Sequence, residues 1–349
     1  MLCRHLKSNE IFIYTYTETQ SRKTMSSFIK LKSLVRNKIV YASLRLNTYS
    51  LKNTIILTSE PRSGSTWLME VIADLMGCVV NWEPLHVDKG IVPKKYKLGE
   101  RPLIRTSDKS ESLKRLFEDI LTFKKYNVWT TQHIAIKNLL IRKYVLTKFV
   151  RANNLLPWFT SRLDLERKPI LLLRHPITTC SSQLKNFQRL TGASLSQPSK
   201  DEKLYSPPDC INNERYIEHQ HYINSLQTPL ERQIALWCIN NYEVSNHPDS
   251  DKWITVYYEH LVLHPEEELT VLFKNLNLSF AMQNADNADF RKPSRTNFLK
   301  EYNRNPTIQL ESFLESFDKA YLQKIQDILD YFEIDNYSAF DAYPINKTY

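Results

Sequence analysis

Short apolar runs alternate with segments of helical spacing along most of this chain. Four runs are bounded by polar residues or proline and predict buried strands: Thr54–Thr58, Ile134–Ile136, Ile170–Leu173 and Trp253–Tyr258. Three segments predict helices: Thr66–Met76, a helix opened by Thr228 and Pro229, and Leu310–Phe332. Strands that alternate with helices predict an α/β fold, in which helices cover both faces of a parallel β-sheet.

The pattern changes near the beginning of the chain and again after residue 190. Residues 1–50 are basic and rich in Ser, Thr and Asn, and we expect them to form a lead-in segment. Residues 51–349 are then one domain. Within it, residues 191–227 are polar, contain three prolines and show no period, so we expect a surface insertion near the mouth of the site. Met1 and Met25 are both candidate start residues, and the sequence does not decide between them.

The charge of the chain limits its partners. The formal net charge is +9 and the pI is about 9.1, which favours an anionic partner. The Lys and Arg residues are scattered along the sequence, which disfavours nucleic acid and leaves anionic small molecules and acidic glycans. The sequence does not predict the oligomeric state.

Cysteine usage and hydropathy indicate the compartment. The five cysteines are widely spaced and form no Cys-x-x-Cys motif, which predicts reduced thiols, no disulfide framework and no metal site. No run of about 18 apolar residues is present, so we expect no integral membrane segment. A cytoplasmic location fits both observations.

The loop after the first predicted strand has the composition of an anion site. Backbone N–H groups at a helix N-terminus attract a phosphate, and Gly64 lets the backbone approach it closely. A Walker motif would place Lys before its Ser/Thr, whereas here Ser65 occupies that position and the basic residue is Arg62. The loop therefore suits a 5′-phosphate better than a nucleoside triphosphate with Mg²⁺.

The run Pro61–Leu68 resembles the 5′-phosphosulfate-binding loop of the sulfotransferase family. The resemblance implies a P-loop NTPase-like three-layer sandwich and, as donor, 3′-phosphoadenosine 5′-phosphosulfate, with adenosine 3′,5′-bisphosphate as product and no metal. Arg62 would also neutralise charge on the leaving group; carbohydrate-type members carry arginine here and soluble phenol- or steroid-type members lysine. The implied donor-binding residues of this loop are Arg62, Ser63, Gly64, Ser65, Thr66 and Trp67.

A second motif resembles the 3′-phosphate site of the same family. Arg174 ends a predicted strand, Pro176 opens a helix and Ser182 lies further along it. An arginine at a strand end can bind phosphate through two hydrogen bonds. Family members commonly carry Asp where this chain has His175, and the role of that residue stays open. A basic loop that holds Ser294 and Arg295 resembles the family loop that closes over the nucleotide.

The catalytic base is less clearly marked. Soluble-type members use the histidine of a Lys-Thr-His run after a central strand; here the matching place after Ile134–Ile136 holds Lys137 without the histidine. Carbohydrate-type members have a Glu-Pro-Leu…His segment after the first helix, which Glu83 and His86 match. Glu83 is the first choice as base and His86 the second, with His133 a distant third.

The sequence thus predicts a sulfotransferase that acts on a hydroxyl or amine acceptor. A carbohydrate acceptor is favoured, with another small molecule as the alternative. Two other readings stay open: an ATP-dependent small-molecule kinase, and a catalytically inactive relative that retains the nucleotide pocket.

Overall fold

The computed structural model describes residues 31–141, 143–198, 214–287 and 305–345. The chain divides into two compact units, Met1–Thr48 and Tyr49–Tyr349. In the first unit, residues 31–46 form a helix. The second unit holds the sheet and every other element described below.

One parallel sheet organises the second unit. Its strands follow the order β2-β3-β1-β4-β5, with β1 in the middle. The strand bounds are β1 Thr54–Ser59, β2 Val79–Trp82, β3 Val145–Val150, β4 Ile170–Leu173 and β5 Ile254–Tyr257.

Thirteen labelled α-helices of the described residues accompany the sheet. They are α2 Ser65–Met76, α3 Glu111–Leu121, α4 Val128–Thr131, α5 Asn138–Ile141, α6 Leu156–Arg162, α7 Pro176–Gln183, α8 Glu214–Glu218, α9 Gln220–Ser225, α10 Pro229–Asn246, α11 Tyr258–Leu263, α12 Pro265–Asn275, α13 Pro306–Ser316 and α14 Lys319–Tyr331. Short 3-10 segments are Leu51–Asn53, Lys94–Tyr96, Asn153–Leu155, Gly192–Leu195, Ser250–Lys252 and Ser279–Asn287, and Leu184–Gln188 is π-helical.

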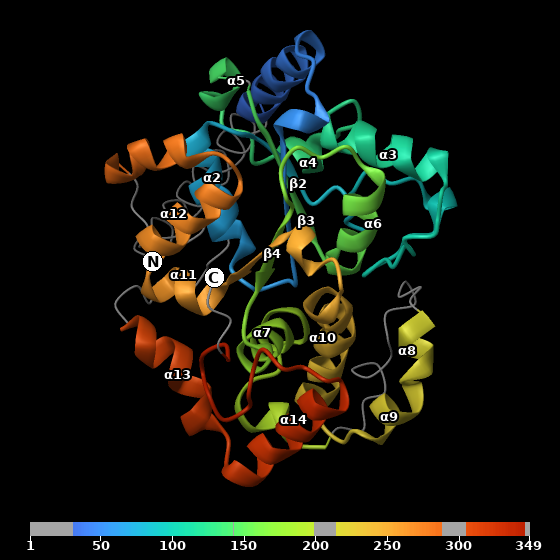
Figure 1. Ribbon diagram of the computed structural model, residues 1–349, viewed down its shortest axis with the longest axis vertical. Helices are drawn as coiled ribbons and strands as arrows, with labels where there is room; N and C mark the ends of the chain where they lie inside the picture. Colours follow the sequence, from blue (N-terminus) through green and yellow to red (C-terminus); the bar gives the residue numbers. More distant parts are fainter. Residues whose placement is uncertain (1–30, 142, 199–213, 288–304, 346–349) are drawn as a thin grey trace, which may run out of the picture. The chain divides into compact units, whose positions relative to one another are not determined.

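Alternating side chains of the strands bury two separate layers. Ile55 and Leu57 pack with α2 and α12 on one face, whereas Ile56 between them packs with α3 and α6 on the other. Figure 1 shows α2, α11 and α12 on one side of the sheet and α3 and α6 on the opposite side. Leu171 and Leu173 of β4 join the second face with α7, α10 and α14. The three-layer α/β fold is therefore confirmed.

Several elements follow the sequence closely. β1, β4 and β5 lie where the apolar runs predict them, and α2 begins one residue early. Helix α10 begins with a capping box: the Thr228 hydroxyl accepts from the Glu231 N–H, and Glu231 returns a bond to the Thr228 N–H. Cys78, Cys180 and Cys238 are free and buried.

Two predicted elements are wrong. Ile134–Ile136 is not a strand: Ile134 closes a turn on Thr131 and Ile136 is exposed. The strand beside β1 is instead β3, and β2 is a further strand that the apolar runs did not reveal. The expected helix Leu310–Phe332 is two helices, because the Asp318 side chain caps the N-terminus of α14.

The part of the expected insertion that the structure describes is helical. Tyr222 of α9 stacks on Tyr331 of α14 at 3.7 Å between ring centroids, and Ile223 is buried in the same cluster. Residues 199–213 lie outside the described ranges, and the expected boundaries of the lead-in, the domain and the insertion stay predictions. In the described part of the chain, no helix has both the length and the apolar character needed to cross a bilayer.

Candidate active site

The loop between β1 and α2 presents unpaired backbone donors. Arg62 and Gly64 both have positive φ, 68° and 87°, which turns the chain sharply into α2. No side chain caps the helix at Gly64. Across the whole set of described residues, no acceptor is found for the N–H groups of Ser63, Gly64, Ser65, Thr66 and Trp67. With the Ser63 hydroxyl also buried and unpartnered, these donors form a cradle suited to an anion.

The glycine at position 64 is required by a neighbouring aromatic ring. A Cβ built on Gly64 would lie 2.4 Å from Cδ2 and from Cε2 of Tyr258, the first residue of α11. Arg174 also contacts this ring, with its guanidinium carbon 4.4 Å from the ring centroid. Tyr258 therefore holds the loop after β4 against the loop after β1.

Two guanidinium groups meet at this edge of the sheet. Arg174 donates through Nη1 to the backbone oxygen of Arg62 at 3.0 Å, and Arg62 donates through Nε to the Ser182 hydroxyl at 3.1 Å. Burial, and then the charge of Arg174, lower the pKa of the Arg62 guanidinium. Among the residues that the structure describes, neither arginine forms an ion pair with a carboxylate. The local positive charge is thus available to an anion.

The His175 ring holds the loop after β4, which carries Arg174, through two hydrogen bonds. Its Nδ1 accepts from the Ile177 N–H at 3.2 Å and so caps α7, while its Nε2 lies 3.0 Å from the Ser338 carbonyl. These two partners require a neutral ring protonated at Nε2. The backbone N–H of His175 donates to Glu259 Oε1 at 2.8 Å, and the Tyr337 hydroxyl donates to Glu259 Oε2 at 3.0 Å.

Burial governs the protonation of this network. Burial lowers the pKa of His175 to about 4, so the ring is neutral at ordinary pH. Burial also raises the pKa of Glu259, against the two donors on its carboxylate. His175 therefore connects the β4 loop to the C-terminal segment.

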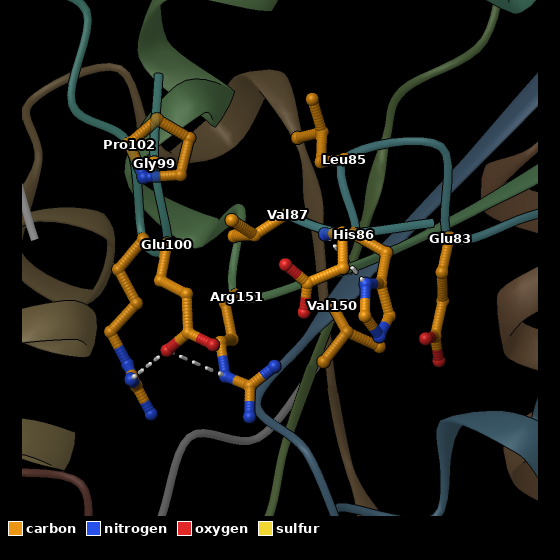
Figure 2. Close-up of a pocket in the computed structure, with 11 residues that line it drawn as sticks. Glu83, Leu85, His86, Val87, Gly99, Glu100, Pro102, Val150 and Arg151 are labelled. Carbon is orange, nitrogen blue, oxygen red and sulfur yellow. Dashed lines mark hydrogen bonds and ion pairs between the residues drawn. The ribbon is translucent and has the colours of Figure 1, made fainter. Parts of the chain in front are cut away.

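A pocket lies next to the C-terminal ends of β2 and β3 (Figure 2). Two contacts join the pocket to the end of β1 and the loop after it. Arg101 forms a buried ion pair with Glu60 at 3.0 Å, and the Arg151 N–H donates to the Ser59 carbonyl at 2.8 Å. Glu100 bridges Arg101 and Arg151 at 3.5 and 3.6 Å. The lining residues are Glu83, Leu85, His86, Val87, Asp88, Gly99, Glu100, Arg101, Pro102, Val150 and Arg151.

Glu83 is held at the pocket wall by a buried lysine. Lys148 of β3 lies 2.7 Å from Glu83 Oε1 and 3.9 Å from the centroid of the Trp82 ring. Burial lowers the pKa of Lys148, and the Glu83 carboxylate opposes that shift. No partner for Glu83 Oε2 is found in the described ranges of the chain. One carboxylate oxygen is therefore fixed and the other is available.

His86 has its ring oriented by backbone. Its Nδ1 accepts from the N–H groups of Asp88 at 3.2 Å and Lys89 at 3.3 Å, so the neutral ring carries its proton on Nε2. A neutral His86 is consequently a donor toward the pocket. His133 is not among the lining residues, and its ring packs 3.9 Å from the Trp82 ring.

Most of the predicted site residues that the structure describes meet at one edge of the sheet, and Lys137 does not join them. Lys137 is exposed and pairs with Asp74 at 3.1 Å, near the far end of α2. Along the helix axis, Asp74 is roughly 14 Å from Ser65, the first residue of α2. Ser294 and Arg295 lie outside the described residues. The structure adds Lys148, Arg151 and Arg101; the apolar residues on either side of Thr147 and Lys148 are the signal that could have revealed β3.

Comparisons with known proteins give fold-level similarity alone. No protein-family model and no curated protein matches the sequence. The solved structures include a sulfotransferase domain from the curacin biosynthetic pathway, 18% identical over 80% of this chain and 96% of that chain, TM-score 0.41. A sulfotransferase domain from the Synechococcus PCC 7002 olefin synthase is 20% identical over 81% and 95%, TM-score 0.40. Mouse sulfotransferase SULT7A1 complexed with PAP is 13% identical over 81% and 85%, TM-score 0.39.

Because these identities and TM-scores are low, function has to be inferred from the residues of the site. Metal chemistry has no visible centre there: within the described ranges, no group of three or more His, Cys, Asp or Glu side chains is arranged to hold a metal ion.

The contact between Gly64 and Tyr258 predicts a position-specific cost. We expect Gly64→Ala to lower the free energy of unfolding by roughly 2 kcal/mol more than Gly192→Ala, because only Gly64 faces a ring. Gly192 has φ 58° with no atom within 4 Å of an added Cβ, so its variant measures the backbone cost alone, about 1 kcal/mol. Urea unfolding of both variants tests this. Equal losses would contradict the close approach.

The buried His175 predicts a pH dependence of stability. Its folded pKa of about 4 is below the ordinary 6.5, so the unfolded chain binds more protons between these values. Stability from this residue is present above pH 6.5 and is lost as pH falls to 4, a loss of roughly 3 kcal/mol.

His175→Asn is the matched variant, since the Asn amide oxygen can retain the cap on α7. Free energies of unfolding measured across this window should fall less steeply for His175→Asn than for the parent. Parallel curves would show that His175 is not held neutral.

Proposed function

We propose that this chain is a sulfotransferase that moves a sulfuryl group from 3′-phosphoadenosine 5′-phosphosulfate to an acceptor hydroxyl or amine. One observation carries the proposal: Arg62 and Arg174 lie together at the N-terminus of α2, and no carboxylate of the described residues pairs with either. Two cationic side chains and a row of free N–H groups suit a ligand with phosphate at two positions.

The donor would be held by the loops after β1 and β4. The N–H groups of Ser63–Trp67 suit the 5′-phosphosulfate, and Arg174 with Ser182 suits the 3′-phosphate. Arg62 lies between them, because its carbonyl contacts Arg174 and its guanidinium contacts Ser182. The buried unpartnered atoms Ser63 Oγ and Arg174 Nε are further donors that fit an anionic group.

The transfer needs a base on the acceptor and positive charge on the leaving group. The acceptor oxygen attacks sulfur in line, its proton passes to Glu83 Oε2, and the bond from sulfur to the phosphate oxygen breaks. Arg62 stabilises the negative charge that develops on that phosphate. Glu83 ranks above His86 because neutral His86 has its Nδ1 lone pair engaged by backbone and a proton on Nε2. Lys148 would position Glu83 through Oε1.

A carbohydrate is the acceptor class that fits the pocket. Charged and polar side chains alternate around it, and its apolar residues are aliphatic, with no aromatic wall. Such a lining offers hydrogen bonds to several hydroxyl groups of one ligand, and a phenol or steroid has too few hydroxyl groups to use them. The cytoplasmic location stays a prediction, and the oligomeric state stays open.

The donor assignment predicts a specific loss for Arg174→Ala. We expect its KM for 3′-phosphoadenosine 5′-phosphosulfate to rise about 10²-fold, since charge-assisted hydrogen bonds are lost. Its preference over adenosine 5′-phosphosulfate should largely disappear. Initial rates with both donors measure this, and thermal-shift titration with adenosine 3′,5′-bisphosphate beside ATP with Mg²⁺ measures binding without catalysis.

Arg115→Ala is the control, because Arg115 is exposed on α3. It should leave KM and donor preference unchanged. Unchanged discrimination in Arg174→Ala, or stronger stabilisation of the parent by ATP with Mg²⁺ than by the bisphosphate, would exclude the proposed donor.

The base assignment predicts losses of different size for two substitutions. Glu83→Gln should lower kcat by about 10²- to 10⁴-fold, with donor binding preserved. His86→Ala should lower it less. Single-turnover rates with labelled donor separate this step from product release. A near-normal kcat for Glu83→Gln together with a large loss for His86→Ala would invert the two roles.

A further inference from the structure

The helix of residues 31–46 has two apolar faces. Val40 and Leu44 are buried, at 0% and 3% exposure. On the opposite side, five large apolar side chains fall within an arc of roughly 140° at helical spacing. They are Leu31, Leu34, Val35, Ile39 and Leu46, between 46% and 81% exposed. An apolar face of this size that stays exposed among the described residues is a candidate interaction surface.

The charge of this helix has one sign. From residue 20 to residue 59 the sequence contains eight Lys and Arg residues and no Asp or Glu. Lys38 and Arg45 are exposed and, at helical spacing, fall on the same side as the apolar arc. Their aliphatic stems can lie along apolar surface while the charged ends extend past it.

We propose that the exposed face of helix 31–46 docks on an anionic lipid surface. Apolar side chains that enter the interface, with cations beside them, are what a helix lying in the plane of a bilayer requires. A second copy of the chain fits less well. Antiparallel pairing of this face would bring Lys38 against Lys38 with no acidic residue on the helix to compensate. The surface lies in the first unit of the chain and does not depend on the proposed catalytic function.

Flotation of the full chain with lipid vesicles tests the proposal. We expect it to float with mixed phosphatidylcholine and phosphatidylglycerol vesicles, and much less with phosphatidylcholine alone or at high salt. Leu34→Gln with Ile39→Gln should lower the partition coefficient at least about 30-fold. Lys38→Gln with Arg45→Gln should lower it roughly 25-fold, about fivefold for each charge.

The matched control replaces two exposed isoleucines of the second unit, Ile217→Gln with Ile308→Gln, at 72% and 61% exposure. It should float as the parent does. Equal binding to both vesicle types, loss of binding in the control, or no flotation of the parent overturns the proposal.

Two further results would assign another occupant. A marked fall in melting temperature for Leu34→Gln with Ile39→Gln, without lipid, means that the face is covered within the chain. Concentration-dependent dimers that this variant abolishes mean that a second copy covers it. Either result overturns lipid docking.

Discussion

The edge of the sheet where β1 and β4 end is organised by two like charges held close together. Arg174 bonds to the carbonyl of Arg62, and burial makes the charged form of Arg62 costly. Such an arrangement persists only because the surrounding structure fixes both side chains. Tyr258 supports the Arg174 guanidinium on one side, and the His175, Glu259 and Tyr337 network holds the loop on the other. The preference for an anion is therefore built into the scaffold before any ligand arrives.

The apolar pattern predicts a buried strand correctly where the strand's own residues are all apolar. β4 reads as four consecutive aliphatic residues and has those bounds in the structure. β3 does not, because Thr147 and Lys148 interrupt it, although both are buried. Thr147 is bonded to Asn81 of the neighbouring strand β2, and Lys148 is bonded to Glu83, the residue after β2. A local sequence pattern does not predict these partners. Because Lys148 is buried in an ion pair with a residue distant in sequence, the apolar pattern does not predict the interior strand β3.

The same limit explains which parts of the site could be found. The loop Pro61–Trp67 and Arg174 are local motifs next to predicted strands, and the structure brings them together. The sequence predicts Lys137 because it follows the predicted strand Ile134–Ile136, but that segment is a turn and Lys137 lies near the far end of α2. Lys148 occupies the strand itself. Glu83 and His86 differ in the hydrogen bonds of their side chains, and these depend on Lys148 and on a backbone turn that composition does not encode.

The two halves of the site differ in how their charges are compensated. Around the pocket, Glu83 pairs with Lys148, Glu60 with Arg101 and Glu100 with Arg151. Because each of these cations has a carboxylate partner, the pocket attracts an anion less strongly than unpaired arginines would. At the loop between β1 and α2, Arg62 and Arg174 have no carboxylate partner among the described residues, so this side of the site carries uncompensated positive charge. An anion is therefore attracted to that loop more strongly than to the pocket, where it would meet carboxylates.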